Sequence, residues 1–163
     1  MSDERGDLRP PSINSDERET LVAFLDYLRE AVIAKALGVE GAGRAGVASG
    51  VSLLWLVKHL TAVEYNWFAW SYAAEDRALE DDEAAVTDDD TPDGLVAAYR
   101  AAAAYSNGIV AGVADLSRPG ARTLRETEPP SMRWVLVHLI EETARHAGHA
   151  DILRERLDGS IGR

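Results

Sequence analysis

Four long segments of the chain place apolar residues three and four positions apart, and this periodicity constrains the fold more than any other feature. The segments cover approximately residues 15–37, 52–74, 92–116 and 131–157. Such spacing produces one buried stripe along an α-helix, whereas a half-buried β-strand would alternate at every second residue. Runs of β-branched residues bounded by turn residues are also missing. The sequence therefore predicts an all-α protein.

Helix-capping residues stand at the ends of these segments. Thr91 followed by Pro92 is a strong helix start, because a capping hydroxyl precedes a proline at the first helical position. The other expected boundaries are, in chain order, a cap at Asn14 or Ser15, a stop at Gly38, a start near Ser52, a cap at Ser131 and a left-handed stop at Gly159.

The connections between the segments are long. Residues 38–50 are glycine-rich, residues 75–90 are acidic, and residues 117–130 contain several prolines, so all three are expected to be loops. Residues 1–14 are polar and are expected to form an irregular lead-in. One four-helix bundle domain is then predicted over residues 15–159.

The apolar stripes define the expected core of this bundle, which a chain of 163 residues is long enough to build. The side chains expected to face inward are Leu21, Phe24, Leu25, Leu28, Val32 and Ala36; Leu53, Leu56, Leu60, Val63, Trp67 and Trp70; Leu95, Tyr99, Ala102, Ile109 and Val113; and Val135 and Leu139, with Ile152 at the edge.

Charge and cysteine content exclude several classes of function. A net charge of −11 argues against nucleic acid and anionic membrane surfaces as partners, because both require concentrated Lys and Arg. The chain has no cysteine, which excludes disulfides, thiolate metal ligands and a cysteine nucleophile. No apolar signal segment or run of about eighteen apolar residues is present. We therefore expect a soluble protein in the cytoplasm.

Three of the four histidines lie close together in the last predicted helix. If Glu142 is set at zero on an ideal helix, His138 falls near roughly −40°, His146 near +40° and His149 near −20°. These side chains share one narrow face with Val135 and Leu139, so the face is partly turned to the core. The fourth histidine, His59, borders the buried stripe of the second helix.

Ionisable groups on a core-facing stripe need partners, because burying even a neutral polar group alone costs roughly 2–7 kcal/mol. A metal ion would be such a partner. Imidazole and carboxylate ligands suit zinc, nickel, iron or manganese, and three protein ligands would leave positions open for catalysis. Two structural interpretations compete: His59 is a hydrogen-bonded packing residue, and Glu142 and His146 are an ordinary surface pair four residues apart.

Residues 138–155, HLIEETARHAGHADILRE, resemble the last-helix signature of the DinB-like superfamily, in a branch of unknown function. The stretches LRPP, ERETLVAFLDYLRE, SLLWLVKHLTAVEYNWF and SMRWVLVHLIEE are similar to the same branch, so the resemblance covers residues 8–159. It implies a four-helix bundle, commonly a homodimer, with a divalent metal between its second and last helices. Many members have two histidines on the last helix, whereas this chain has Glu142 and His146, as in relatives that use mycothiol, such as the mycothiol-dependent maleylpyruvate isomerase.

The resemblance carries over to individual residues. It implies His59, Glu142 and His146 as metal ligands, zinc being the first choice. His149 would be a nearby or substitute ligand and could accept a proton from a thiol, while His138 would pack one turn deeper. Further candidates are Lys58, Arg133 and Arg145 for an anionic part of the cofactor or substrate, and Trp55, Trp67 and Trp70 for a pocket wall; the charges could equally be solvated, and the tryptophans could belong to the core.

The resemblance implies a metal-dependent thiol S-transferase that activates a small thiol such as mycothiol for attack on an electrophile. Since the chain has no cysteine, the nucleophile would come from outside. Two alternatives remain open: a metal-dependent hydrolase, and a non-catalytic, stress-responsive dimer whose metal stabilises the bundle.

Overall fold

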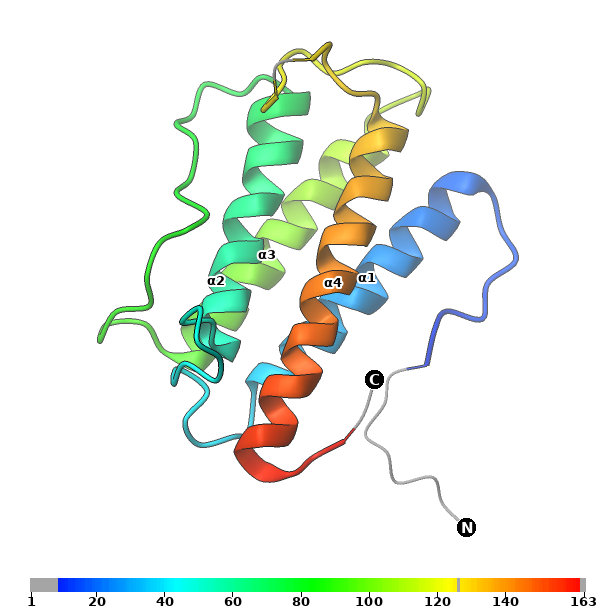
Figure 1. Ribbon diagram of the computed structural model, residues 1–163. Coiled ribbons are helices and arrows are strands. Elements are labelled where there is room, and N and C mark those ends of the chain that lie inside the picture. The colour runs from blue at the N-terminus through cyan, green and yellow to red at the C-terminus, as the bar shows by residue number, and fades with distance from the viewer. Residues whose placement is uncertain (1–8, 126, 162–163) are drawn as a thin grey trace.

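The computed structural model describes residues 9–125 and 127–161, and within them the protein is helical, with no β-strand (Figure 1). The elements are α1 (Glu17–Ala36), α2 (Leu53–Glu64) with its π-helical continuation η1 (Tyr65–Tyr72), α3 (Pro92–Ala111) and α4 (Met132–Asp158). The predicted all-α four-helix bundle is confirmed. Residues 9–14 are irregular, and the rest of the predicted lead-in lies outside the described residues.

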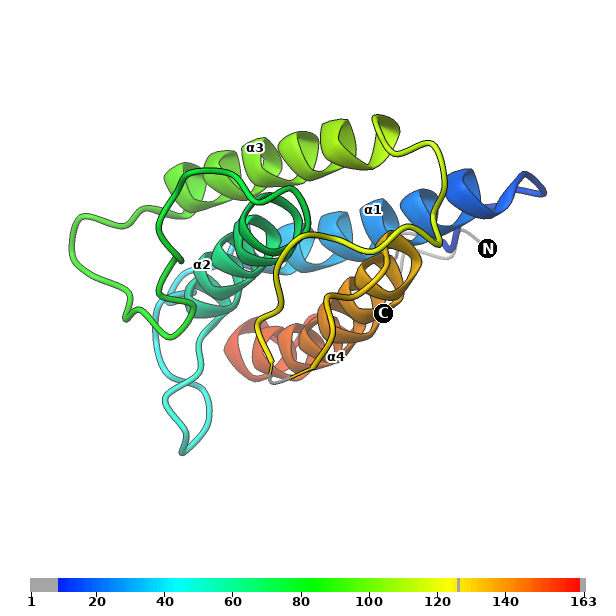
Figure 2. The same cartoon turned by 90° about the horizontal axis from the view of Figure 1, so that it is seen from above.

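The helices form two closely packed pairs. α1 lies along α4 and α2 lies along α3, and α2 also contacts α1 and α4 (Figures 1 and 2). Figure 1 shows the long connection between η1 and α3, drawn in green, running back beside α2. Within the described residues, no helix combines the length and the apolar character needed to cross a bilayer.

Side-chain caps fix most helix ends where the sequence places them. The hydroxyls of Ser52, Thr91 and Ser131 each accept a hydrogen bond from a backbone N–H three residues later. Gly159 ends α4 in the left-handed conformation at φ 77°, which a residue with a side chain rarely adopts. The predicted cap of α1 is wrong by one residue: the carboxylate of Asp16 accepts from the N–H of Glu19.

The second helix changes its hydrogen bonding halfway along. From Tyr65 its backbone is π-helical, with bonds between residues five apart instead of four, so the wider turns shift which side chains face inward. As a result, Phe68 is fully buried, whereas Trp70, predicted to face the core from α-helical spacing, is only half-buried.

Two further details of the helices differ from what the apolar spacing predicted. Phe24 is exposed, because the inner face of α1 runs through Leu25, Arg29 and Val32. α3 ends at Ala111 instead of continuing to residue 116, since the chain turns at Gly112, whose N–H bonds to the carbonyl of Gly108. Ile109 and Val113 are consequently half-buried, and Ile152 on α4 is exposed.

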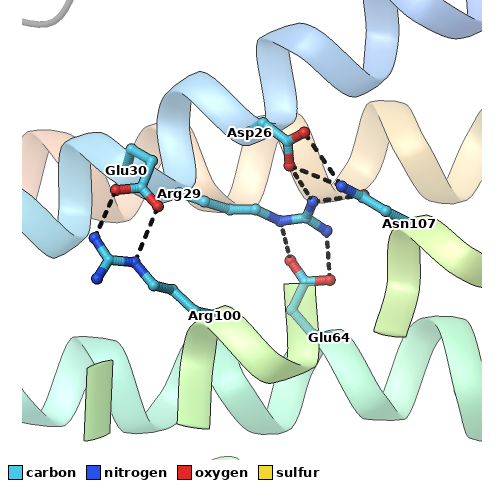
Figure 3. A network of polar contacts seen from close by, with 6 residues as sticks. All are labelled: Asp26, Arg29, Glu30, Glu64, Arg100 and Asn107. Carbon is cyan, nitrogen blue, oxygen red and sulfur yellow. Dashed lines mark hydrogen bonds and ion pairs between the residues drawn. The ribbon is translucent and has the colours of Figure 1, made fainter. Parts of the chain in front are cut away.

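A buried polar cluster lies between two apolar clusters of the core (Figure 3). The guanidinium of Arg29 donates to both carboxylate oxygens of Glu64, at 2.7 and 2.6 Å, and to Asp26 and Asn107. Arg29 and Glu64 are both almost completely buried. Burial acts to lower the pKa of Arg29, but the Glu64 carboxylate outweighs it and the pKa is raised. The Arg29 guanidinium therefore stays charged inside the bundle, and its contact with Glu64 joins α1 to α2.

Candidate metal centre

Side chains of α2 and α4 converge halfway along the bundle. Oε1 of Glu142 lies 3.2 Å from Nε2 of His59 and 3.0 Å from Nε2 of His146. The two imidazole rings are 4.8 Å apart and nearly perpendicular, at 69°. One ligand atom from each of the three residues lies within 4.8 Å of the other two, so together they could hold a divalent cation. The sequence nominated these three residues, and the fold brings them together.

His59 is oriented by a backbone carbonyl. Its Nδ1 lies 2.7 Å from the carbonyl oxygen of Asp82. Because a carbonyl only accepts, Nδ1 carries the proton in the neutral ring, and the lone pair on Nε2 faces Glu142. Two acceptors 3.2 Å apart repel each other unless a positive group lies between them. The donor set thus fits a divalent ion, and the Asp82 carbonyl is the outer partner that metal-binding histidines usually have.

The segment that supplies this carbonyl is fastened to the helices at two places. The buried amide of Asn66 donates to the carbonyl of Glu80 at 3.0 Å and accepts from its N–H at 2.8 Å. Farther along, the ammonium of Lys58 donates to the carbonyl of Ala85 and pairs with Asp90 at 2.7 Å. The acidic connection, predicted to be a solvated loop, is irregular but is held against α2. Lys58, proposed to bind a cofactor, fastens this segment.

His146 has its own neighbours. Its Nδ1 lies 3.3 Å from Nδ1 of His149, a distance at which one nitrogen donates and the other accepts. His149 is exposed, so it connects the His146 ring to solvent. On the other side, the Trp55 ring stacks on His59 at 4.8 Å and meets His146 edge-on at 6.5 Å. Trp55 thus restricts both imidazoles.

The environment favours the protonation states that bind metal. Burial lowers the pKa of His146, and the nearby His59 lowers it further, so its imidazole is neutral at neutral pH. Burial would raise the pKa of Glu142, but its close contacts with His59 and His146 outweigh this, and the pKa lies below its ordinary value. A neutral imidazole and an ionised carboxylate are both ready ligands.

The two predicted cofactor-binding arginines point elsewhere. Arg133 pairs with Glu17 of α1 at 2.6 Å, and Arg145 is exposed, 4.0 Å from Glu141. Neither has a contact with the three candidate ligands among the interactions of the described residues. His138 does lie one turn from Glu142, as expected, stacked on Trp134 at 5.0 Å and edge-on to Trp67 at 4.6 Å.

A cavity of about 390 Å³ opens beside the candidate ligands. His59 and Glu142 line it together with His138, Asn66 and Arg125. Asn66 and Arg125 were not among the residues expected at the site. An amide within the apolar second helix was a usable signal for Asn66, whereas nothing in the spacing of the irregular stretch marked Arg125.

The fold and this site together define a class: a helical bundle whose second and last helices offer a His/Glu/His set to a divalent cation. The model of the family named mycothiol-S-transferase matches residues 20–159, and the chain belongs to this family. The predicted DinB-like membership is thereby confirmed. A comparison with curated proteins finds no match.

Proposed function

We propose that the protein is a divalent-metal-dependent S-transferase that joins a small thiol of the mycothiol type to an electrophile. One observation carries the proposal: in a member of the mycothiol-S-transferase family, ligand atoms of His59, Glu142 and His146 lie within 4.8 Å of one another. Two of them, His59 and Glu142, border a cavity large enough for a small molecule. The thiol has to come from outside, because the chain contains no cysteine.

The proposed metal ligands are Nε2 of His59, a carboxylate oxygen of Glu142 and Nε2 of His146, with zinc as the expected ion. A bound divalent ion would stabilise the thiolate form of an incoming thiol, which is the nucleophilic form. The protein's own contribution is to orient the ligands: the Asp82 carbonyl fixes the His59 ring, and Trp55 stacks on it.

His149 is proposed to accept the thiol proton. It is exposed and contacts His146, so it can pass a proton between the site and solvent. The ion pairs of Lys58, Arg133 and Arg145 do not support direct contact with a cofactor, so the proposal does not depend on them. The homodimer, the cytoplasmic location and the domain limits at residues 15 and 159 stay predictions.

The decisive experiment measures thiol consumption by zinc-loaded protein with mycothiol and monobromobimane as the electrophile. We expect acceleration over the uncatalysed reaction, lost on chelation and in Glu142→Gln. Glu141→Gln is the matched control, since it makes the same change at an exposed side chain next to Glu142 on the same helix. Zinc-dependent hydrolysis without any thiol would favour the hydrolase alternative. If mycothiol and bacillithiol both react no faster with the protein than without it, the S-transferase proposal is wrong.

A further inference from the structure

A second cavity of about 390 Å³ adjoins the cavity of the candidate metal centre. Both are lined by Trp67 and Arg125, so the two spaces meet at these residues. The second cavity lies between the start of α4 and the segment before it, with Trp134 and Pro130 as further walls. We call it the aromatic cavity. It contains none of the candidate metal ligands, and the thiol-activating role does not account for it.

Two tryptophan rings line this cavity. Trp67 and Trp134 are 5.3 Å apart, and Trp134 stacks on His138 at 5.0 Å with an angle of 25° between the rings. Trp134 is nevertheless 41% exposed while it lines the cavity. Its ring is therefore held by two neighbours and still accessible to a ligand. Such surfaces bind flat molecules by stacking, which adds to the effect of burying apolar area.

The charges at the cavity are balanced. The guanidinium carbon of Arg125 lies 5.9 Å from the Trp67 ring and 5.6 Å from the Trp134 ring. Arg125 forms no ion pair with a described residue, while Glu128 lines the same cavity. A ligand with a strong net charge would meet one attractive and one repulsive group. An uncharged ring avoids the repulsion and can also stack beneath the Arg125 guanidinium.

We propose that the aromatic cavity binds the body of the electrophile, and that this body is planar, apolar and uncharged. The inference rests on the proposed function, because that function requires an electrophile to reach the thiol. The shared walls Trp67 and Arg125 place a molecule in the aromatic cavity next to the space bordered by His59 and Glu142. The polar thiol then occupies the other cavity, which Asn66, Glu80 and Asp82 line.

A bromomethyl-substituted ring illustrates the reaction. The thiolate sulfur attacks the CH₂ carbon, the new S–C bond forms as the C–Br bond breaks, and bromide leaves with the electron pair. The thiol proton passes to solvent. No oxidant or reductant is needed. The aromatic cavity contributes by holding the ring so that the CH₂ carbon faces the thiol.

Binding is tested first without any reaction, by calorimetry of the purified full chain with dimethylbimane, which has the planar ring but no leaving group. We expect saturable binding, with and without zinc, that Trp134→Ala and Trp134→Leu weaken about ten-fold. Trp70→Ala is the control, because Trp70 also presents a tryptophan ring but lines neither cavity. Absence of binding to the unmodified protein, or equal losses in the Trp134 and Trp70 variants, would overturn the proposal.

Kinetics then separate this proposal from the proposed function. In Trp134→Leu, KM for monobromobimane should rise about ten-fold, while KM for mycothiol and the rate with iodoacetamide, which has no ring, stay unchanged. A rise in KM for mycothiol instead would assign the cavity to the thiol and contradict the proposal. If dimethylbimane binds as expected but no thiol is transferred, the S-transferase proposal fails while the aromatic cavity keeps its ligand class.

Discussion

Nδ1 of His59 lies 2.7 Å from the carbonyl oxygen of Asp82, a residue 23 positions later in an irregular segment. The helices supply the candidate ligands, but this carbonyl decides which nitrogen of His59 faces Glu142. The position of the carbonyl depends in turn on Asn66, which bonds to both backbone groups of Glu80. The candidate centre therefore depends on the connection between η1 and α3 as well as on the bundle.

Replacing Asn66 with alanine should weaken zinc binding although Asn66 is not a candidate ligand. The variant loses both bonds to Glu80, so the Asp82 carbonyl no longer has a fixed position beside Nδ1 of His59. Losing an outer partner of a metal ligand typically reduces affinity about 10- to 100-fold. Competition with a chromogenic chelator measures this change directly.

Asn107→Ala is the matched control for Asn66→Ala. Asn107 also makes side-chain hydrogen bonds, to Asp26 and Arg29, but it belongs to the polar cluster between α1, α2 and α3. The variant should lose stability without a change in zinc affinity. Equal zinc affinities in the two variants would contradict the positioning role of Asn66.

Each candidate ligand should be needed for stoichiometric zinc. His59→Ala, Glu142→Ala and His146→Ala should each lower affinity by more than the roughly 100-fold upper range for outer partners. Zinc at 100 times its Kd should stabilise the unmodified protein by about 2.7 kcal/mol, an increment that these variants lack. Metal analysis after gel filtration, together with melting curves, tests both points. The variant His138→Gln should still bind one zinc per chain. A loss of zinc in this variant would contradict the assignment of the three ligands.

The sequence predicted the helices and the three side chains that converge at the site. It predicted less well the contacts that orient those side chains. Capping residues and apolar spacing are local properties, and so they located the starts of α2, α3 and α4 and the end of α4 within about two residues. His59 could be connected with Glu142 and His146 because family resemblance linked positions that no local pattern relates.

The details that sequence reasoning missed are those that depend on tertiary packing. The π-helical bonding from Tyr65 onward and the burial of Arg29 both need partners from other helices, which periodicity does not describe. The Asp82 carbonyl is a backbone group, so its role leaves no trace in the choice of side chain. The ion pairs of Lys58 and Arg133 could not be predicted, because their carboxylate partners, Asp90 and Glu17, lie far away in sequence.

The metal-free protein should lose stability as the pH falls below about 6.5. Burial lowers the pKa of His138, and the nearby Arg125 lowers it further. Burial also lowers the pKa of His146, and the nearby His59 lowers it further. Between the lowered folded pKa and the unfolded value the unfolded chain binds more protons, so acid favours unfolding. Urea unfolding in EDTA at pH 7.5, 6.5 and 5.5 should show this decline, and it should be shallower in His138→Asn. An unchanged slope in that variant would exclude His138 as a source.

The buried pair of Arg29 and Glu64 should be costly to break on one side only. Arg29→Met leaves the Glu64 carboxylate buried without its guanidinium, and Glu64→Leu leaves the guanidinium with only Asp26 and Asn107 (Figure 3). Each single variant should lose about 3–5 kcal/mol of unfolding free energy in urea titrations. The double variant replaces both charges with apolar side chains, so it should recover most of the loss. Additive losses in the double variant would mean that the two side chains act independently, despite the 2.6 Å contact between them.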